Sequence, residues 1–123
     1  MTDYKLRQVL FCRYKWRLLK HAEEKGFFLV ESEGCLMSLR KSRLGVVFED
    51  GVHMRGSNHY NRMATDFVLY DPETGNAVSD GNDPRWVELG EFWESIDPAL
   101  CRWGGRFESV DSGHFSVAWG GKA

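Results

Sequence analysis

The sequence predicts an α+β domain in which helices pack around a small, mostly antiparallel sheet. Two segments, residues 3–25 and 84–96, carry apolar side chains at helical spacing. Three shorter segments, residues 27–30, 64–70 and 114–119, have the length and residue types of strands. A turn-rich link at 71–76 can return the chain as a hairpin.

A single domain over residues 1–123 is expected, because 123 residues of which 42% are hydrophobic can bury one modest core. The net charge of −2 gives no reason to expect a nucleic-acid partner, and no apolar run is long enough for stable membrane insertion. Three cysteines without a C-x-x-C pair favour a reducing compartment. The best early apolar run, residues 9–12, is cut by Arg13, so no signal peptide is expected. We therefore expect a monomer that is made in a cytoplasm.

The first helix is predicted to begin at Asp3, which can cap it, and to stop at Gly26. Its apolar positions recur every four residues, at Leu6, Leu10, Tyr14, Leu18 and Ala22. Basic residues crowd this stretch and leave a nucleic-acid or membrane-surface role open, but a helix with one buried and one solvated face is the simpler interpretation.

Residues 27–30 are expected to form a short buried strand, residues 35–44 a weaker helix, and residues 51–60 a loop. In the strand at 64–70, Asp66 shares a face with Ala64 and Val68. The link at 71–76 leads to a return through residues 77–78.

The second helix is predicted to start at Asp83 followed by Pro84, a cap and first-turn signature. Gly90 weakens this helix locally. Its buried face carries Trp86, Leu89, Trp93 and Ile96. The last strand alternates, with His114, Ser116 and Ala118 on one face.

Two strand-like runs each offer metal ligands at unusual places, His59 with Asp66 and His114 with Asp111. A catalytic zinc site uses three protein ligands and leaves one position for water. Two histidines and one aspartate satisfy that count, and the remaining acid can serve as the base for that water. Either aspartate could serve as this base. We assign Asp66, held within a strand, to the metal and Asp111, in the turn sequence Asp-Ser-Gly, to the base.

The segment from Ser57 to Asp66 resembles the S-x-H-x(4)-A-x-D pattern of the M15 zinc peptidases, the group of D-Ala-D-Ala carboxypeptidases and phage L-alanyl-D-glutamate endolysins. Trp103-Gly104-Gly105 and the run from Asp111 to Phe115 resemble the W-G-G and D-x-x-H-F elements of that family. The similarity is sharpest at residues 57–66 and 103–115.

The resemblance implies zinc bound by His59, Asp66 and His114, with Asp111 as general base, and a small fold shared with the Hedgehog signalling domain. It also implies a phage-type endolysin that hydrolyses the peptidoglycan stem peptide at the L-Ala-D-Glu bond. Such an enzyme would stay in the host cytoplasm until a holin opens the membrane. A D,D-carboxypeptidase or dipeptidase on D-Ala-D-Ala ends is the alternative within the class, and a non-catalytic, zinc-containing wall-binding module is the alternative outside it.

The sequence departs from the family pattern at two places. Arg62 stands where the family often has glycine, three residues after the first histidine. Upstream, the family usually has an arginine and a glutamine that bind the substrate and polarise the scissile carbonyl, but residues 38–44 hold no glutamine. The arginine is assigned to Arg40, with Arg43 and Arg55 as alternatives.

Two residues are assigned to the substrate rather than to the metal. Ser57 is expected to bind substrate or to hold its loop, and Trp103 to line the substrate groove or to be buried.

Overall fold

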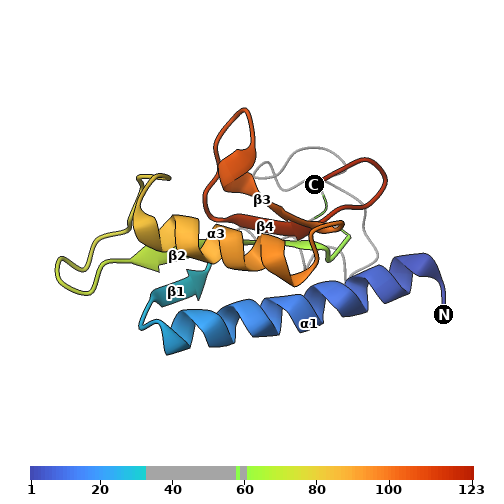
Figure 1. Ribbon diagram of the computed structural model, residues 1–123, viewed down its shortest axis with the longest axis horizontal. Coiled ribbons are helices and arrows are strands. Elements are labelled where there is room, and N and C mark those ends of the chain that lie inside the picture. The colour runs from blue at the N-terminus through green and yellow to red at the C-terminus, as the bar shows by residue number, and fades with distance from the viewer. Residues whose placement is uncertain (33–57, 59–60) are drawn as a thin grey trace.

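The computed structural model describes residues 1–32, 58 and 61–123. Its elements are α1 (Asp3–Glu24), β1 (Phe28–Glu31), β2 (Ala64–Tyr70), α3 (Pro84–Ile96), β3 (Cys101–Trp103), the short 3-10 helix η1 (Gly104–Arg106) and β4 (His114–Val117). The described strands pair antiparallel in the order β1-β2-β4-β3. Figure 1 shows α1 and α3 running beside each other along this sheet. The predicted α+β class is confirmed.

Capping residues at the two ends of α1 explain where the helix begins and ends. The hydroxyl of Thr2, not the carboxylate of Asp3, accepts the hydrogen bond from the Lys5 amide, so the cap lies one residue earlier than predicted. Gly26 adopts a left-handed φ of 75°, and the Phe27 amide next to it donates to the carbonyl of Ala22. Gly26 thus ends the helix as expected.

The predicted apolar stripe of α1 is wrong at its beginning. Leu6 is 45% exposed, whereas Phe11, Leu18 and Ala22 are buried. At 3.6 residues per turn, a repeat of four residues advances by about 40° per step, so the stripe has rotated by roughly 160° between Leu6 and Ala22. Only its later members can therefore face the sheet.

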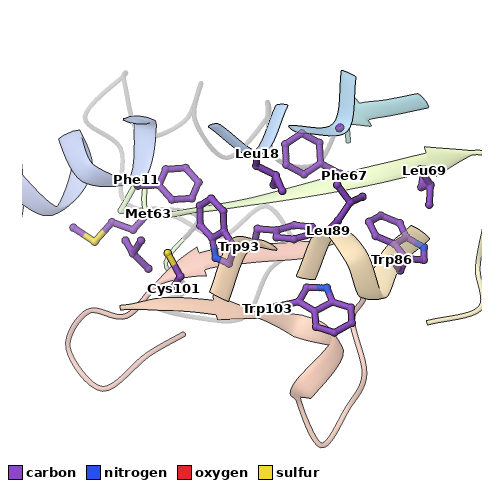
Figure 2. Packing of buried hydrophobic residues seen from close by; sticks show 13 residues of the cluster. Phe11, Leu18, Met63, Phe67, Leu69, Trp86, Leu89, Trp93, Cys101 and Trp103 are labelled. Carbon is purple, nitrogen blue, oxygen red and sulfur yellow. The ribbon is translucent and has the colours of Figure 1, made fainter. Parts of the chain in front are cut away.

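The core lies between the helices and one face of the sheet, where aromatic side chains from distant segments meet (Figure 2). Phe115 on β4 is fully buried, and its ring packs 5.8 Å from those of both Phe67 and Trp93. Burial of each such side chain contributes about 1.5–3 kcal/mol. Residues alternate along β2, so Thr65 and Phe67 face this core while Asp66 between them faces away.

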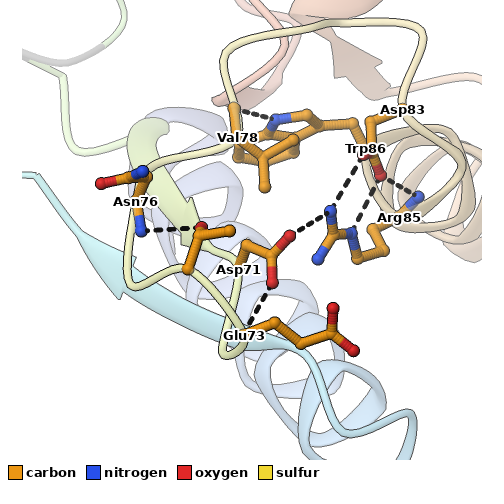
Figure 3. Close-up of polar contacts among 8 residues, drawn as sticks. Asp71, Glu73, Asn76, Val78, Asp83, Arg85 and Trp86 are labelled. Carbon is orange, nitrogen blue, oxygen red and sulfur yellow. Dashed lines mark hydrogen bonds and ion pairs between the residues drawn. The ribbon is translucent and has the colours of Figure 1, made fainter.

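The loop after β2 is fixed to the start of α3 by ionic and indole contacts (Figure 3). The carboxylate of Asp83 caps the helix by accepting from the Arg85 amide at 2.9 Å, and it also accepts from the Arg85 guanidinium, which lowers the pKa of Asp83. Arg85 also lies 3.6 Å from Asp71. The indole of Trp86 donates to the carbonyl of Val78 at 2.8 Å. The expected return of the chain is a single bridge between Tyr70 and Ala77.

One strand that the sequence does not predict, β3, pairs with β4 at one edge of the sheet. It has three residues, too few for an alternating pattern to stand out. The last strand ends at Val117, two residues earlier than predicted. The helix expected over 35–44 lies outside the described residues, as does the loop over 51–60 except for Asn58, which lies in a turn.

Candidate metal centre

Asp66 and His114 meet on the sheet face that points away from the helices. They are direct partners in the antiparallel β2–β4 pair, and the Asp66 Oδ1 and His114 Nδ1 atoms lie 3.4 Å apart. The His114 side chain is buried, while that of Asp66 is 23% exposed. Strand register, rather than a flexible loop, therefore sets the separation of these two groups.

Asp111 completes the cluster from the exposed turn before β4. Asp66, Asp111 and His114 each offer one ligand atom, and these atoms all lie within 4.8 Å of one another. The turn is held against β2 because the Phe67 amide donates to the Gly113 carbonyl at 2.8 Å. A Cβ atom on Gly113 would lie 2.4 Å from the Phe67 oxygen, so only glycine permits this close approach.

The donor set suits zinc. Zinc accepts imidazole nitrogen and carboxylate oxygen at about 2.0–2.2 Å, so two ligands of one ion lie at most ~4.4 Å apart. The spread within the Asp66, Asp111 and His114 cluster is close to this limit, so small side-chain rotations would bring all three to one ion.

The structure brings together three of the predicted site residues, Asp66, Asp111 and His114. Five others, His59, Ser57, Arg40 and the alternative arginines Arg43 and Arg55, lie outside the described residues, so their roles stay predictions. His21 stacks on Phe92 with ring centres 3.9 Å apart and lies 3.5 Å from Glu88.

Trp103 is 3% exposed, so its ring lies within the core rather than open to a substrate. Its indole Nε1 donates to the carbonyl of Ser112 at 2.8 Å, inside the turn that carries Asp111. Its link to the cluster is thus through the backbone.

Asn58 directly precedes the predicted ligand His59 and has a structural role that the sequence does not predict. Its buried side-chain amide donates to the carbonyls of Val117 and Lys122, at 3.1 and 3.0 Å. The main-chain carbonyl of Asn58 accepts hydrogen bonds from the main-chain amides of Asn61 and Met63. An amide side chain inside a motif, directly before a ligand, is the signal that could have indicated an anchoring residue.

Comparison with known families decides the class of this protein. Residues 51–117, more than half of the chain and including both predicted motif segments, match an M15 peptidase family described as D-alanyl-D-alanine carboxypeptidase. The chain belongs to the M15 peptidase family. The resemblance inferred from the sequence is confirmed. All three members of the candidate metal cluster lie within the matched region.

Among solved structures, the M15 chain is similar to the L-Ala D-Glu endopeptidase ChiX of Serratia marcescens. The two share 18% identity over 75% of this chain and 68% of ChiX, with a TM-score of 0.45. No curated protein matches the chain. Within the described residues, neither helix is both long and apolar enough to cross a membrane.

Proposed function

We propose that this M15 peptidase is a zinc-dependent enzyme that hydrolyses the stem peptide of peptidoglycan. The observation that carries the proposal is the convergence of Asp66, Asp111 and His114 within one family-matched region. In this proposal Asp66 and His114 hold zinc together with His59. When bound, zinc supplies a Lewis acid for amide hydrolysis.

Asp111 has the surroundings of a general base. It is exposed and lies in a turn, so its carboxylate can reach a water molecule on the solvent side of the cluster. Asp111 accepts the proton of the attacking water and then delivers it to the leaving amine. Asp66, placed within β2, keeps a fixed position during this transfer.

Arg40 is proposed to stabilise the developing oxyanion, and Ser57 to contact the substrate. Separate Arg40→Ala, Arg43→Ala and Arg55→Ala variants test the first assignment. We expect Arg40→Ala to lose turnover while the other two retain it. Loss in Arg43→Ala or Arg55→Ala with near-normal turnover in Arg40→Ala would move the role to that arginine.

The bond that we propose is L-Ala-D-Glu, as the sequence resemblance to phage endolysins implies. A D,D-carboxypeptidase is the second candidate, and the description of the matching family favours it. Both would act on the same stem peptide but at opposite ends. They therefore leave different products.

Digestion of purified peptidoglycan, followed by mass spectrometry of the products, separates these functions. Glycan fragments that keep only L-Ala, with peptides that begin at D-Glu, support the endopeptidase. Released D-Ala supports the carboxypeptidase. The Asp111→Asn variant is the matched control, because it keeps the size of the side chain and removes the base. Wall binding without any zinc-dependent product would instead support a non-catalytic module.

A further inference from the structure

Trp103 holds the backbone of the turn that carries two members of the metal cluster. Its Nε1 donates to the Ser112 carbonyl at 2.8 Å, and Ser112 follows Asp111 directly. The ring is buried at the end of β3, and β3 itself is paired with β4. A paired strand therefore reaches the turn through one indole hydrogen bond.

Gly104, the next residue, holds the other side of the same turn. Its carbonyl accepts from the Asp111 amide at 3.0 Å, and the Asp111 carbonyl accepts from the His114 amide at 3.1 Å. The segment between Asp111 and His114 is therefore tied to both Trp103 and Gly104. These bonds fix the main chain on either side of the Asp111 side chain.

Glycines make room for this arrangement. A Cβ atom on Gly90 would lie 2.1 Å from the Trp103 ring, and one on Gly105 would lie 2.3 Å from it. On Gly104, a Cβ atom would lie 2.0 Å from the Asp111 carbonyl oxygen and 2.8 Å from the His114 Cβ. Gly90, which was expected to weaken α3, therefore leaves the space beside the helix that the Trp103 indole occupies.

The outer side of the indole is covered by a cation. The Arg106 guanidinium lies 5.2 Å from the Trp103 ring centre and is paired with Glu94 on α3 at 3.1 Å. The ring is enclosed by α3, η1 and this ion pair, which limits its rotation. A ring held in this way keeps its N–H directed at Ser112.

We propose that Trp103 is a positioning residue, which sets the places of Asp111 and His114 through the carbonyl of Ser112. The proposal rests on the proposed zinc peptidase function. Partners that orient metal ligands typically contribute 10–100-fold to metal affinity or activity. Reaction rates are also sensitive to displacements of about 1 Å in a catalytic group.

The Trp103→Phe variant tests the proposal, and Trp86→Phe is its matched control. Both tryptophans are buried, and each donates one indole hydrogen bond of 2.8 Å to a loop carbonyl, but Trp86 donates to Val78, outside the cluster. We expect similar losses of thermal stability in the two variants. We expect only Trp103→Phe to weaken zinc binding and lower kcat, each by about 10–100-fold.

Three measurements on the whole chain give these results. Competition with a chromophoric chelator gives the zinc affinity, and peptidoglycan digestion gives kcat. Amide hydrogen exchange at Asp111 and His114 reports on the turn without depending on activity, and we expect it to be faster in Trp103→Phe alone. Equal zinc affinity, kcat and exchange in the two variants would overturn the proposal.

A second pair of variants covers the case in which Trp103→Phe does not fold. Gly104→Ala pushes on the backbone of the same turn from the other side, whereas the nearest atoms to a Cβ atom on Gly81 would belong to side chains, Val110 at 3.2 Å and Ser112 at 3.6 Å. We expect Gly104→Ala to lose zinc affinity and Gly81→Ala to keep it, and equal affinity would overturn the proposal. If the wild type binds zinc and cleaves the wall but the variants do not differ, the positioning role alone is wrong. If the wild type does neither, the proposed function is wrong and this inference with it.

Discussion

Asp66 and His114 are directly opposed across the β2–β4 pair, with 3.4 Å between Oδ1 and Nδ1. Neither depends on a long loop for its position, because each occupies a place in a paired strand. A one-residue slip of either strand would turn its own candidate ligand toward the core and away from the other. The hydrophobic pattern that buries Phe67 and Phe115 therefore also places the two candidate ligands on the opposite face.

We predict that His114→Ala and Asp66→Asn each abolish stoichiometric zinc binding. Each variant removes one proposed ligand, and two remaining ligands hold zinc far less tightly. His21→Ala is the control, since His21 contacts Phe92 and Glu88 rather than the cluster. Metal content after gel filtration, measured by mass spectrometry, gives the result. Full zinc occupancy in both ligand variants would contradict the assignment.

For Asp111→Asn we predict retained zinc and a loss of kcat by about 10²–10⁴-fold, the usual contribution of a general base. The amide keeps the shape of the carboxylate but cannot accept the proton. Zinc titration and peptidoglycan turnover of the same preparation separate the two possible roles of this residue. Loss of zinc together with activity would instead make Asp111 a ligand, which its place within the cluster would also allow.

Sequence patterns predicted the parts of this fold that repeat over many residues. The aromatic face of α3 and the alternation along β2 are long enough to be recognised, and they place Trp93 in the core and Asp66 outside it. The three residues of β3 have no such pattern, because their conformation depends on pairing with β4.

The candidate site was predicted by residue type and spacing, but its supporting contacts were not. Asp66, Asp111 and His114 were recognised because their side chains are metal ligands or bases. The hydrogen bond from Trp103 to the Ser112 carbonyl has no sequence signal, since any residue supplies a carbonyl. The role of Gly90 was also hidden, because a close approach to Trp103 is a property of the folded chain.

We predict that Cys101 resists alkylation in the folded protein while Cys12 reacts. Burial raises the pKa of the Cys101 thiol to about 12, whereas Cys12 is exposed. The reactive form is the thiolate, so Cys101 is protected from the reagent both by its burial and by its protonated state. Labelling with iodoacetamide at about pH 8, with mass spectrometry of the peptides, measures both sites. A Cys35→Ser background removes the third thiol, and labelling in concentrated guanidinium chloride provides the unfolded control.

The raised pKa of the Cys101 thiol also predicts that the free energy of unfolding falls as the pH rises from about 9 toward about 12. In the unfolded chain the thiol loses its proton near its ordinary pKa of 9.0, while the folded chain retains it. High pH therefore favours the unfolded state. Denaturant titrations across this range should show a smaller decline for Cys101→Ala than for the wild type. An equal decline would show that Cys101 contributes nothing to it.

Arg62 has a positive φ of 58°, the conformation for which glycine is best suited, at the position where the family often has glycine. We predict that Arg62→Gly stabilises the fold by roughly 0.5–1 kcal/mol. Relief of the left-handed strain, about 1–2 kcal/mol, exceeds the added backbone entropy of glycine in the unfolded chain. Denaturant unfolding measures the difference.

Arg62→Ala is the control, because it removes the same side chain but keeps the Cβ atom and its strain. Equal free energies of unfolding in the two variants would contradict the prediction. The turn around Arg62 is closed by the Asn61 and Met63 amides, which both donate to the Asn58 carbonyl, at 3.2 and 2.9 Å. Because these bonds determine the backbone there, we expect arginine, alanine and glycine to adopt the same conformation. Zinc affinity should therefore remain unchanged while the stability differs.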